Sequence, residues 1–192
     1  MTQRSKVKLI NVELSEPNVL LLDYAEFCWN DGPWEEKEEI LRIDNIMRGR
    51  LGIPLKLEAY RQPYSSLPES RKPRGTLKLL FAFDSEVDIS NPRLALEKAK
   101  DVQIILDGLI VPSAVESWRV DEELHTVKLP SISSGSHKIE LTYAYGLMTN
   151  LERIYILGDF ASTSAAPKQP YTPHNSPSSP SATGLNKVSQ PT

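Results

Sequence analysis

The side chains in this chain that could do chemistry are carboxylates, three histidines and one cysteine. Acidic residues cluster at Asp121–Glu123, and Glu152 and Asp159 follow later in the chain. Hydrolysis of a glycosidic bond needs a carboxyl group on each side of the bond, one of them protonated near neutral pH. Neighbouring side chains of a strand point to opposite faces, so those of Asp121–Glu123 diverge. The sequence therefore indicates no self-contained acid–base pair, and an active hydrolase is kept as the least favoured of the functions considered.

The histidines and the cysteine form no pattern typical of a metal site or a nucleophile. His125 and His137 belong to separate expected strands, and His174 lies near the C-terminus. Zinc ligands typically come in close pairs such as Cys-x-x-Cys, and the sequence contains none. Cys28 lies in an apolar and aromatic run, which is typical of a small buried residue. We therefore predict no catalytic residue, no metal ligand and no cofactor.

Aromatic side chains are the remaining candidates for contact with a ligand. Sugars stack their C–H faces on exposed rings, and their hydroxyls bind charged or amide groups. Trp118 stands next to Arg119 and three residues before Asp121. With the turn residue Asp107, these are the candidate carbohydrate-binding residues. Packing in the core is the alternative role for Trp118.

The elements that must position these residues are short strands. From Thr76 to Phe160, turn signals recur every several residues and no helical pattern intervenes. Leu77, Leu79 and Phe81 give the first strand one apolar face. The further expected strands are Arg93–Glu97, Val102–Leu106, Leu109–Val111, Ser117–Val120, Leu124–Leu129, His137–Tyr143 and Arg153–Leu157. This series predicts an antiparallel β-sandwich of jelly-roll type.

The N-terminal third adds strands and one helix. Alternation predicts a strand at Val7–Leu14, and Val19–Leu22 and Tyr24–Trp29 are expected to pair with each other. A helix is expected near residues 34–51, because four glutamates open it and an apolar stripe runs along it. Gly52 stands where a C-terminal cap belongs. This helix is expected to cover one end of the sandwich.

The C-terminal segment differs from the rest in composition. Residues 161–192 hold six of the fifteen prolines and many Ser, Thr and Ala. Such a segment cannot bury enough surface to offset the entropy lost on ordering. We therefore expect a folded domain over residues 1–160 and a disordered tail over residues 161–192.

Charge and hydropathy disfavour several classes of protein. The net charge is −3, so the chain is poorly suited to nucleic acids or anionic membranes. No apolar run approaches the roughly 20 residues of a membrane span. The N-terminus has no signal-peptide core, and the single cysteine rules out an internal disulfide framework. A reducing compartment such as the cytoplasm is favoured for the chain as given.

Several segments together carry a family resemblance. They are EPNVLLLDYAEF (Glu16–Phe27), EEILRIDNIMRGRLG (Glu38–Gly52), LALE (Leu94–Glu97), ILDGLIVPS (Ile105–Ser113), WRVD (Trp118–Asp121) and LERIYILGDF (Leu151–Phe160). This combination resembles the galactose-binding-like β-sandwich region of large glycoside-hydrolase-type proteins, related to glycoside hydrolase family 2 and the α-L-rhamnosidase-like group. Where that family commonly has Asn-Gly, this chain has Asp107-Gly108, and Gly135-Ser136-His137 stands for Gly-x-Asn.

The resemblance implies an accessory domain with catalysis elsewhere. The chain has no room for a catalytic barrel of roughly 250 residues. The expected function is a non-catalytic carbohydrate-binding or scaffolding module, whose partners would be an oligosaccharide and a glycosidase catalytic domain. The alternative is a sandwich that binds another protein and no sugar.

Overall fold

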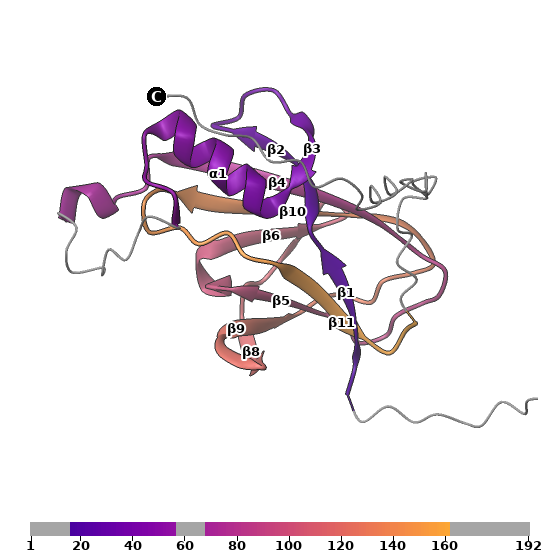
Figure 1. Ribbon diagram of the computed structural model, residues 1–192. Coiled ribbons are helices and arrows are strands. Elements are labelled where there is room, and N and C mark those ends of the chain that lie inside the picture. The colour runs from indigo at the N-terminus through magenta and orange to yellow at the C-terminus, as the bar shows by residue number, and fades with distance from the viewer. Residues whose placement is uncertain (1–15, 57–67, 162–192) are drawn as a thin grey trace, which may run out of the picture. The chain divides into compact units, whose positions relative to one another are not determined.

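The computed structural model describes residues 16–56 and 68–161, all within one compact unit, Met1–Ser162. Their strands form two antiparallel sheets, which confirms the predicted antiparallel β-sandwich (Figure 1). The five-stranded sheet has the order β1 (Asn18–Leu22), β11 (Ile154–Gly158), β5 (Arg93–Glu97), β9 (Asp121–Lys128) and β8 (Val115–Arg119). The six-stranded sheet has the order β3 (Glu35–Glu39), β2 (Tyr24–Trp29), β4 (Gly75–Ser85), β10 (Gly135–Tyr145), β6 (Val102–Leu106) and β7 (Leu109–Val111).

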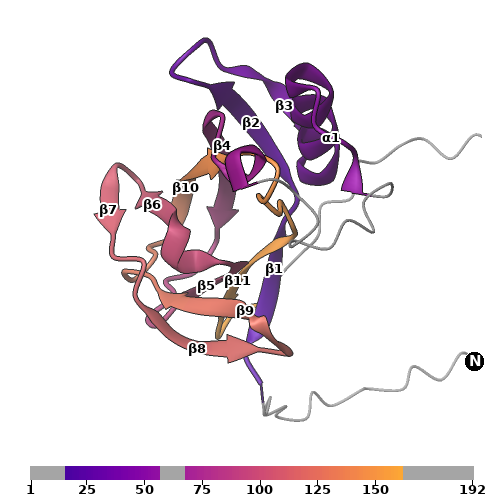
Figure 2. The same ribbon diagram turned by 90° about the vertical axis from the view of Figure 1, so that its left-hand side faces the viewer.

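The two sheets lie as layers around one hydrophobic core. Figure 2 shows the six-stranded sheet running from β3 and β2 at the top to β7 at the left, with β8 and β9 of the other sheet below. Alternation along β4 and β10 brings Leu79 opposite Leu141 and Phe81 opposite Ile139, and all four side chains are buried. The residues between them, such as Leu80 and Glu140, therefore face outward from the six-stranded sheet.

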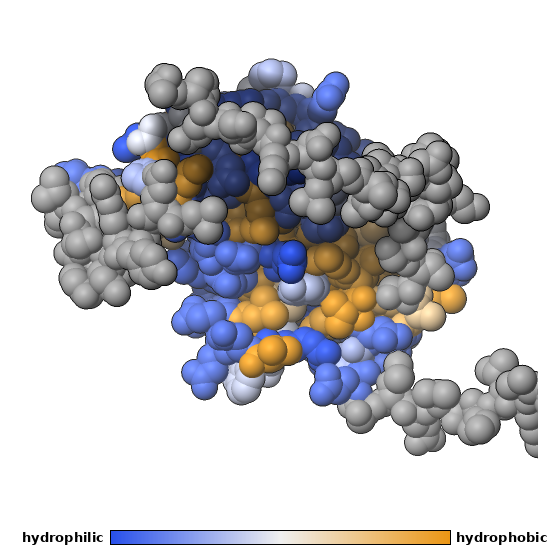
Figure 3. Space-filling model, in the orientation of Figure 1, coloured by the Kyte–Doolittle hydropathy of each residue, from blue (hydrophilic) through white to orange (hydrophobic). Residues whose placement is uncertain are grey.

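Two 3₁₀ turns complete the described elements, at Pro68–Arg71 and Ala99–Asp101. On the opposite side of the molecule from the six-stranded sheet's outer face, hydrophobic residues gather in the middle and hydrophilic ones at the lower rim (Figure 3). No helix in the described ranges is long and apolar enough to cross a membrane. The expected strand Val7–Leu14 lies outside the described residues, as does the expected tail beyond Ala161.

The α-helix α1 is shorter than its sequence pattern suggests, spanning Ile40–Leu51. The glutamates expected in its first turn instead belong to β3, which pairs with β2 at the edge of the sheet. Pairing satisfies backbone groups of β2 that a helix would leave open. Glu39 then caps the helix, because its carboxylate accepts a hydrogen bond from the N–H of Arg42 at 3.0 Å.

The C-terminus of α1 is capped as expected. Gly52 has a φ of 62°, and its N–H bonds back to the carbonyls of Arg48 and Gly49. Ile40, Ile43 and Met47 are buried in the core, and Figure 2 shows α1 beside β2 and β3. The helix thus covers one side of the sandwich through its apolar stripe.

A buried charged cluster fixes α1 to the connection between β10 and β11. Arg48 Nε donates to Asp44 Oδ2 at 2.8 Å, and the hydroxyl of Tyr145 donates to Asp44 Oδ1 at 2.7 Å. The guanidinium of Arg48 also donates to the carbonyl oxygens of Pro54 and Thr149. Since Asp44 and Arg48 are almost fully buried, this network replaces the water that both charges lose.

The expected pairing of Val19–Leu22 with Tyr24–Trp29 is wrong. β1 pairs with β11 in one sheet, whereas β2 pairs with β3 and β4 in the other. Only Asp23 separates β1 from β2, which is too short for the two-residue turn of a hairpin. The chain therefore crosses between the sheets at Asp23, whose carbonyl accepts from the N–H of Ile40 at 2.8 Å.

The expected strand Ser117–Val120 ends in a sharp turn at Val120. β8 ends at Arg119 and β9 begins at Asp121, and these two residues face each other in the hairpin. Val120 between them has a φ of 65°, a left-handed conformation that is uncommon for a β-branched residue. Because valine favours strands, the sequence carried no signal for this turn.

Candidate functional site

The structure places the four predicted carbohydrate-binding residues at two separate edges. Asp107 lies in the turn between β6 and β7, at the end of the six-stranded sheet. Trp118, Arg119 and Asp121 lie at the β8–β9 hairpin, at the edge of the five-stranded sheet. The four residues therefore stand on different sheets and do not line one common groove.

The β8–β9 hairpin is exposed. Trp118 is 54% exposed, so its alternative role as a core residue is wrong. Arg119 forms an ion pair with Glu16 at 3.1 Å, and Asp121 Oδ1 accepts a hydrogen bond from the N–H of Glu123 at 2.9 Å. The charged groups beside the indole thus have partners that fix the hairpin itself.

A groove with a volume of about 600 Å³ lies over the outer face of the six-stranded sheet. Its apolar lining is Trp34, Leu80, Ala82, Phe83 and Ile105. Its remaining lining is Asp84, Asp107, Gly108, Ser136, His137, Lys138 and Glu140. Trp34 comes from the β2–β3 connection and is 42% exposed. Of the four residues predicted from sequence, the groove contains Asp107.

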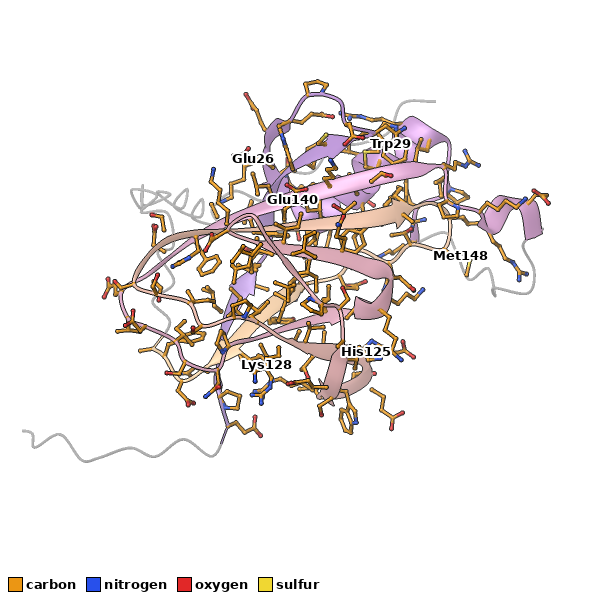
Figure 4. The ribbon with its side chains drawn as sticks, turned by 180° about the vertical axis from the view of Figure 1, so that it is seen from behind. Glu26, Trp29, His125, Lys128, Glu140 and Met148 are labelled. Carbon is orange, nitrogen blue, oxygen red and sulfur yellow. The ribbon has the colours of Figure 1, made fainter. Side chains whose placement is uncertain are left out.

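The floor of the groove is set by strand register. Leu80 of β4 stands opposite Glu140 of β10, which stands opposite Ile105 of β6. Glu26 of β2 continues this row beyond Leu80, and Ile110 of β7 continues it beyond Ile105. Figure 4, which views the molecule from behind, labels Glu26 and Glu140 on this sheet. Five strands thus contribute one residue each to a single line across the sheet.

His137 is held at the lip of the groove by two acceptors. Its Nδ1 lies 2.7 Å from Asp107 Oδ2, and its Nε2 lies 2.7 Å from the carbonyl oxygen of Ser133. The ring also lies against Phe83, with centroids 5.5 Å apart. A carboxylate and a carbonyl can only accept, so this geometry favours the imidazole form in which both ring nitrogens donate, which is the positively charged form.

The charges of this pair support each other. The hydrogen bond to Asp107 raises the pKa of His137 above its ordinary value, although burial opposes the shift and the Ser133 carbonyl adds to it. Burial works to raise the pKa of Asp107, but the hydrogen bonds from His137 and from the N–H of Lys138 hold it below its ordinary value. Asp107 is therefore an ionised acceptor with no proton to donate.

His137 lines the groove, although the sequence pattern does not identify it as a binding residue. It stands at the start of the expected strand His137–Tyr143, 30 residues after Asp107. Asp107 and His137 are the two positions at which the chain departs from the turn pattern of the family that it resembles. No local sequence pattern brings the two residues together, because their contact depends on the pairing of β6 with β10.

No metal site is evident in residues 16–56 and 68–161, where no three His, Cys, Asp or Glu residues are grouped to hold an ion. Cys28 is buried, and its thiol donates to the carbonyl oxygen of Gly32 at 3.1 Å. The arrangement at the groove can therefore offer ring stacking, apolar contact, carboxylate acceptors and an ammonium donor.

Among solved structures, the chain is similar to a glycoside hydrolase. The chain is similar to two crystal structures of a GH2 β-galacturonidase from Eisenbergiella tayi, one bound to galacturonate and one bound to glycerol. Each match has 15% sequence identity and a TM-score of 0.38, and covers 77% of this chain and 25% of that chain. The chain thus spans about a quarter of the length of that enzyme. Neither a model of a protein family nor a curated protein matches the sequence.

Proposed function

We propose that this chain is a non-catalytic carbohydrate-binding domain of glycoside hydrolase origin, and that the groove on the six-stranded sheet is its site. The observation that carries the proposal is the composition of that groove. It combines the exposed ring of Trp34, an apolar floor of Leu80 and Ile105, and charged groups held in fixed positions. Sugar rings need this mixture of a flat apolar surface and directed polar partners.

The same groups favour binding over catalysis. A glycosidase requires a carboxyl group that stays protonated until it protonates the leaving group. Asp107 is ionised and both of its oxygens accept hydrogen bonds, from His137 and from the Lys138 N–H. Asp84 accepts a hydrogen bond from the hydroxyl of Ser136 at 2.6 Å. These carboxylates are arranged as acceptors for hydroxyl groups.

The test is a titration of the chain with a panel of plant and microbial oligosaccharides, in which isothermal calorimetry measures the binding. We expect Trp34→Ala to weaken binding about tenfold, because a ring stack is lost. Trp118→Ala is the matched control, since it removes an exposed indole outside the groove. Both variants should keep the near-ultraviolet and far-ultraviolet signatures of the folded chain.

Three results would contradict this proposal. If no sugar of the panel produces a heat of binding, the chain is not a carbohydrate-binding domain. If Trp118→Ala weakens binding and Trp34→Ala does not, the site is the hairpin of Trp118, Arg119 and Asp121. Turnover of a glycoside that a single carboxylate substitution abolishes would make the chain an enzyme.

A protein-binding sandwich is the second candidate function. Leu109, Ile110 and Val120 are large apolar residues left exposed at the edges of the two sheets. Exposed apolar edges of this kind are common at protein interfaces. In this case the partner would be a glycosidase catalytic domain. Complex formation with such a domain, measured by sedimentation velocity and lost on Ile110→Lys, would favour this function.

A further inference from the structure

The line of residues across the six-stranded sheet bears on the shape of the ligand. We infer that the groove takes a neutral oligosaccharide chain lying across the strands, from Trp34 toward Ile110, rather than a single sugar. This inference rests on the proposed function and adds the length, direction and charge of the ligand.

The register gives the direction. Glu26, Leu80, Glu140, Ile105 and Ile110 stand opposite one another on β2, β4, β10, β6 and β7. Their line runs perpendicular to the strands. Strands are spaced by about 4.8 Å, so the four intervals from β2 to β7 cover about 19 Å. This length exceeds that of one sugar ring, and a compact ligand would leave one end of the line empty.

The order of side chains along the line suits a chain of rings. Carboxylates at Glu26 and Glu140 alternate with apolar side chains at Leu80 and Ile105. Linked sugar rings likewise present apolar C–H faces between hydroxyl-bearing edges. A hydroxyl group can donate to a carboxylate, and such a charge-assisted hydrogen bond is strong.

Ile110 marks the far end of the line. It is 71% exposed although it is a large apolar residue, and it continues the apolar floor beyond Ile105. Leu109 beside it is 66% exposed but belongs to the opposite face of β7, since neighbouring residues alternate. The two residues therefore form a matched pair for a test of where the ligand ends.

The charges over the sheet favour a neutral ligand. Glu26, Asp84 and Glu140 form no ion pair with another described residue. Two cations of this face are already engaged, since Lys78 pairs with Asp31 and His137 pairs with Asp107. Among the described residues that line the groove, Lys138 is the cation left to offset Asp84 and Glu140. A chain of uronic acids would bring further negative charge against them.

The experiment measures affinity against chain length. Neutral xylo-, manno-, cello- and galacto-oligosaccharides from the monosaccharide to the hexasaccharide are titrated into the full chain by calorimetry. Oligogalacturonides of the same lengths provide the acidic comparison. For the neutral sugar that binds, we expect affinity to rise at least about tenfold from the monosaccharide to the tetrasaccharide, as more of the line is covered.

The two β7 variants locate the end of the ligand. Ile110→Ala should weaken tetrasaccharide binding about fivefold and leave binding of the monosaccharide unchanged. Leu109→Ala should change neither. Glu140→Gln should reduce the preference for neutral over acidic chains, since it removes one negative charge from the centre of the line.

The outcomes separate this inference from the proposed function. If the monosaccharide binds as tightly as the hexasaccharide, the inference is wrong and the carbohydrate-binding function stands. Tighter binding of oligogalacturonides than of every neutral chain also overturns it. If no sugar of any length binds, both proposals fail.

Discussion

At the scale of single residues, the contact between His137 and Asp107 defines the groove's lip. Ring nitrogens at 2.7 Å from a carboxylate oxygen and from a carbonyl oxygen leave no acceptor role for the imidazole. Loss of one proton would set a nitrogen lone pair against an oxygen lone pair. The imidazole therefore bonds to Asp107 and to the Ser133 carbonyl at the same time only while His137 is charged.

This contact predicts how stability depends on pH. The pKa of His137 is raised on folding, so the charged form is favoured by the fold. The contact with the half-exposed Asp107 contributes about 1 kcal/mol to the free energy of unfolding. This contribution is complete below the pKa of about 6.5 that His137 has in the unfolded chain. It is lost as the pH rises through the higher pKa of the folded state. Urea unfolding should show this loss in the wild type and not in His137→Gln.

His125→Gln is the control, because His125 has no counterpart to the Asp107 contact. It should keep the alkaline loss of stability that the wild type shows. The pKa of Asp107 shifts downward, so its own contribution is present above about 3.8 and disappears as the pH falls through the folded-state value. An NMR titration that places the His137 pKa at or below 6.5 would refute the explanation.

Asp107 could be predicted as a site residue from the sequence, whereas its partner His137 could not. Asp107-Gly108 is a turn signal that depends on neighbouring residues, and the structure has a turn there with both residues at positive φ. His137 meets Asp107 only because β6 and β10 are adjacent in the sheet. Such adjacency depends on strand order, which local patterns do not encode.

At the scale of elements, the two glycines of α1 have opposite roles. Gly49 lies on the exposed helix surface with φ in the ordinary range, and a Cβ there would meet nothing within 4 Å. Gly52 also has open space around it, but its φ of 62° is a left-handed conformation. Space is therefore equal at the two positions, and the backbone conformation distinguishes them.

We predict that Gly49→Ala and Gly52→Ala shift stability in opposite directions. Alanine at position 49 should stabilise the chain by about 0.5–1 kcal/mol, because it favours the helix. Alanine at position 52 should destabilise it by about 1–2 kcal/mol, because its Cβ disfavours the left-handed cap. The free energy of unfolding in urea measures both changes. A stabilising Gly52→Ala would show that the cap does not limit the helix.

The misassigned elements share a physical cause. Residues 35–39, four of which are glutamates, have the composition of a helix start, yet they form a strand that pairs with the edge of β2. Val120 has the composition of a strand, yet the hairpin requires a turn there. In both places, pairing with a neighbouring strand determines the conformation against the local helix or strand propensity of the residues. The strands Tyr24–Trp29, Arg93–Glu97 and Val102–Leu106, by contrast, have the bounds that their sequence predicts, because each is a short, largely apolar run bounded by polar or turn residues.

At the scale of the whole molecule, α1 is joined to the far end of the fold through buried polar groups. Asp44 and Tyr145 are 101 residues apart in the chain, and so are Arg48 and Thr149. Opening of the helix away from the sheets would break the hydrogen bonds of Asp44 with Tyr145 and of Arg48 with the Thr149 carbonyl. The helix and the strands should therefore unfold together.

Substitutions in this cluster test that coupling. Asp44→Ala should destabilise the chain by about 3–5 kcal/mol, because it leaves the Arg48 guanidinium buried without its carboxylate. Tyr145→Phe should cost about 1–2 kcal/mol, since only one donor is removed. Circular dichroism for the helix and tryptophan fluorescence for the sheets should report a single transition in each variant. Separate transitions would show that α1 is an independent unit.

The sandwich class followed from sequence because many short alternating strands have few other ways to bury one face each. Which strands lie side by side did not follow. The groove needs β4, β10 and β6 as neighbours, although β10 follows the other two in the chain by several elements. Its floor of Leu80, Glu140 and Ile105 is therefore invisible in any single segment.

The pairing of β1 with β11 brings the ends of the described sandwich together. Asn18 stands opposite Gly158, and the side-chain amide of Asn18 donates to the carbonyl oxygen of Phe160. A polypeptide that enters this domain at Asn18 thus leaves it at almost the same point in space. Such a domain can be spliced into a surface loop of another protein without stretching either end. The sandwich would then behave as a self-contained insertion, with both joints on the same side.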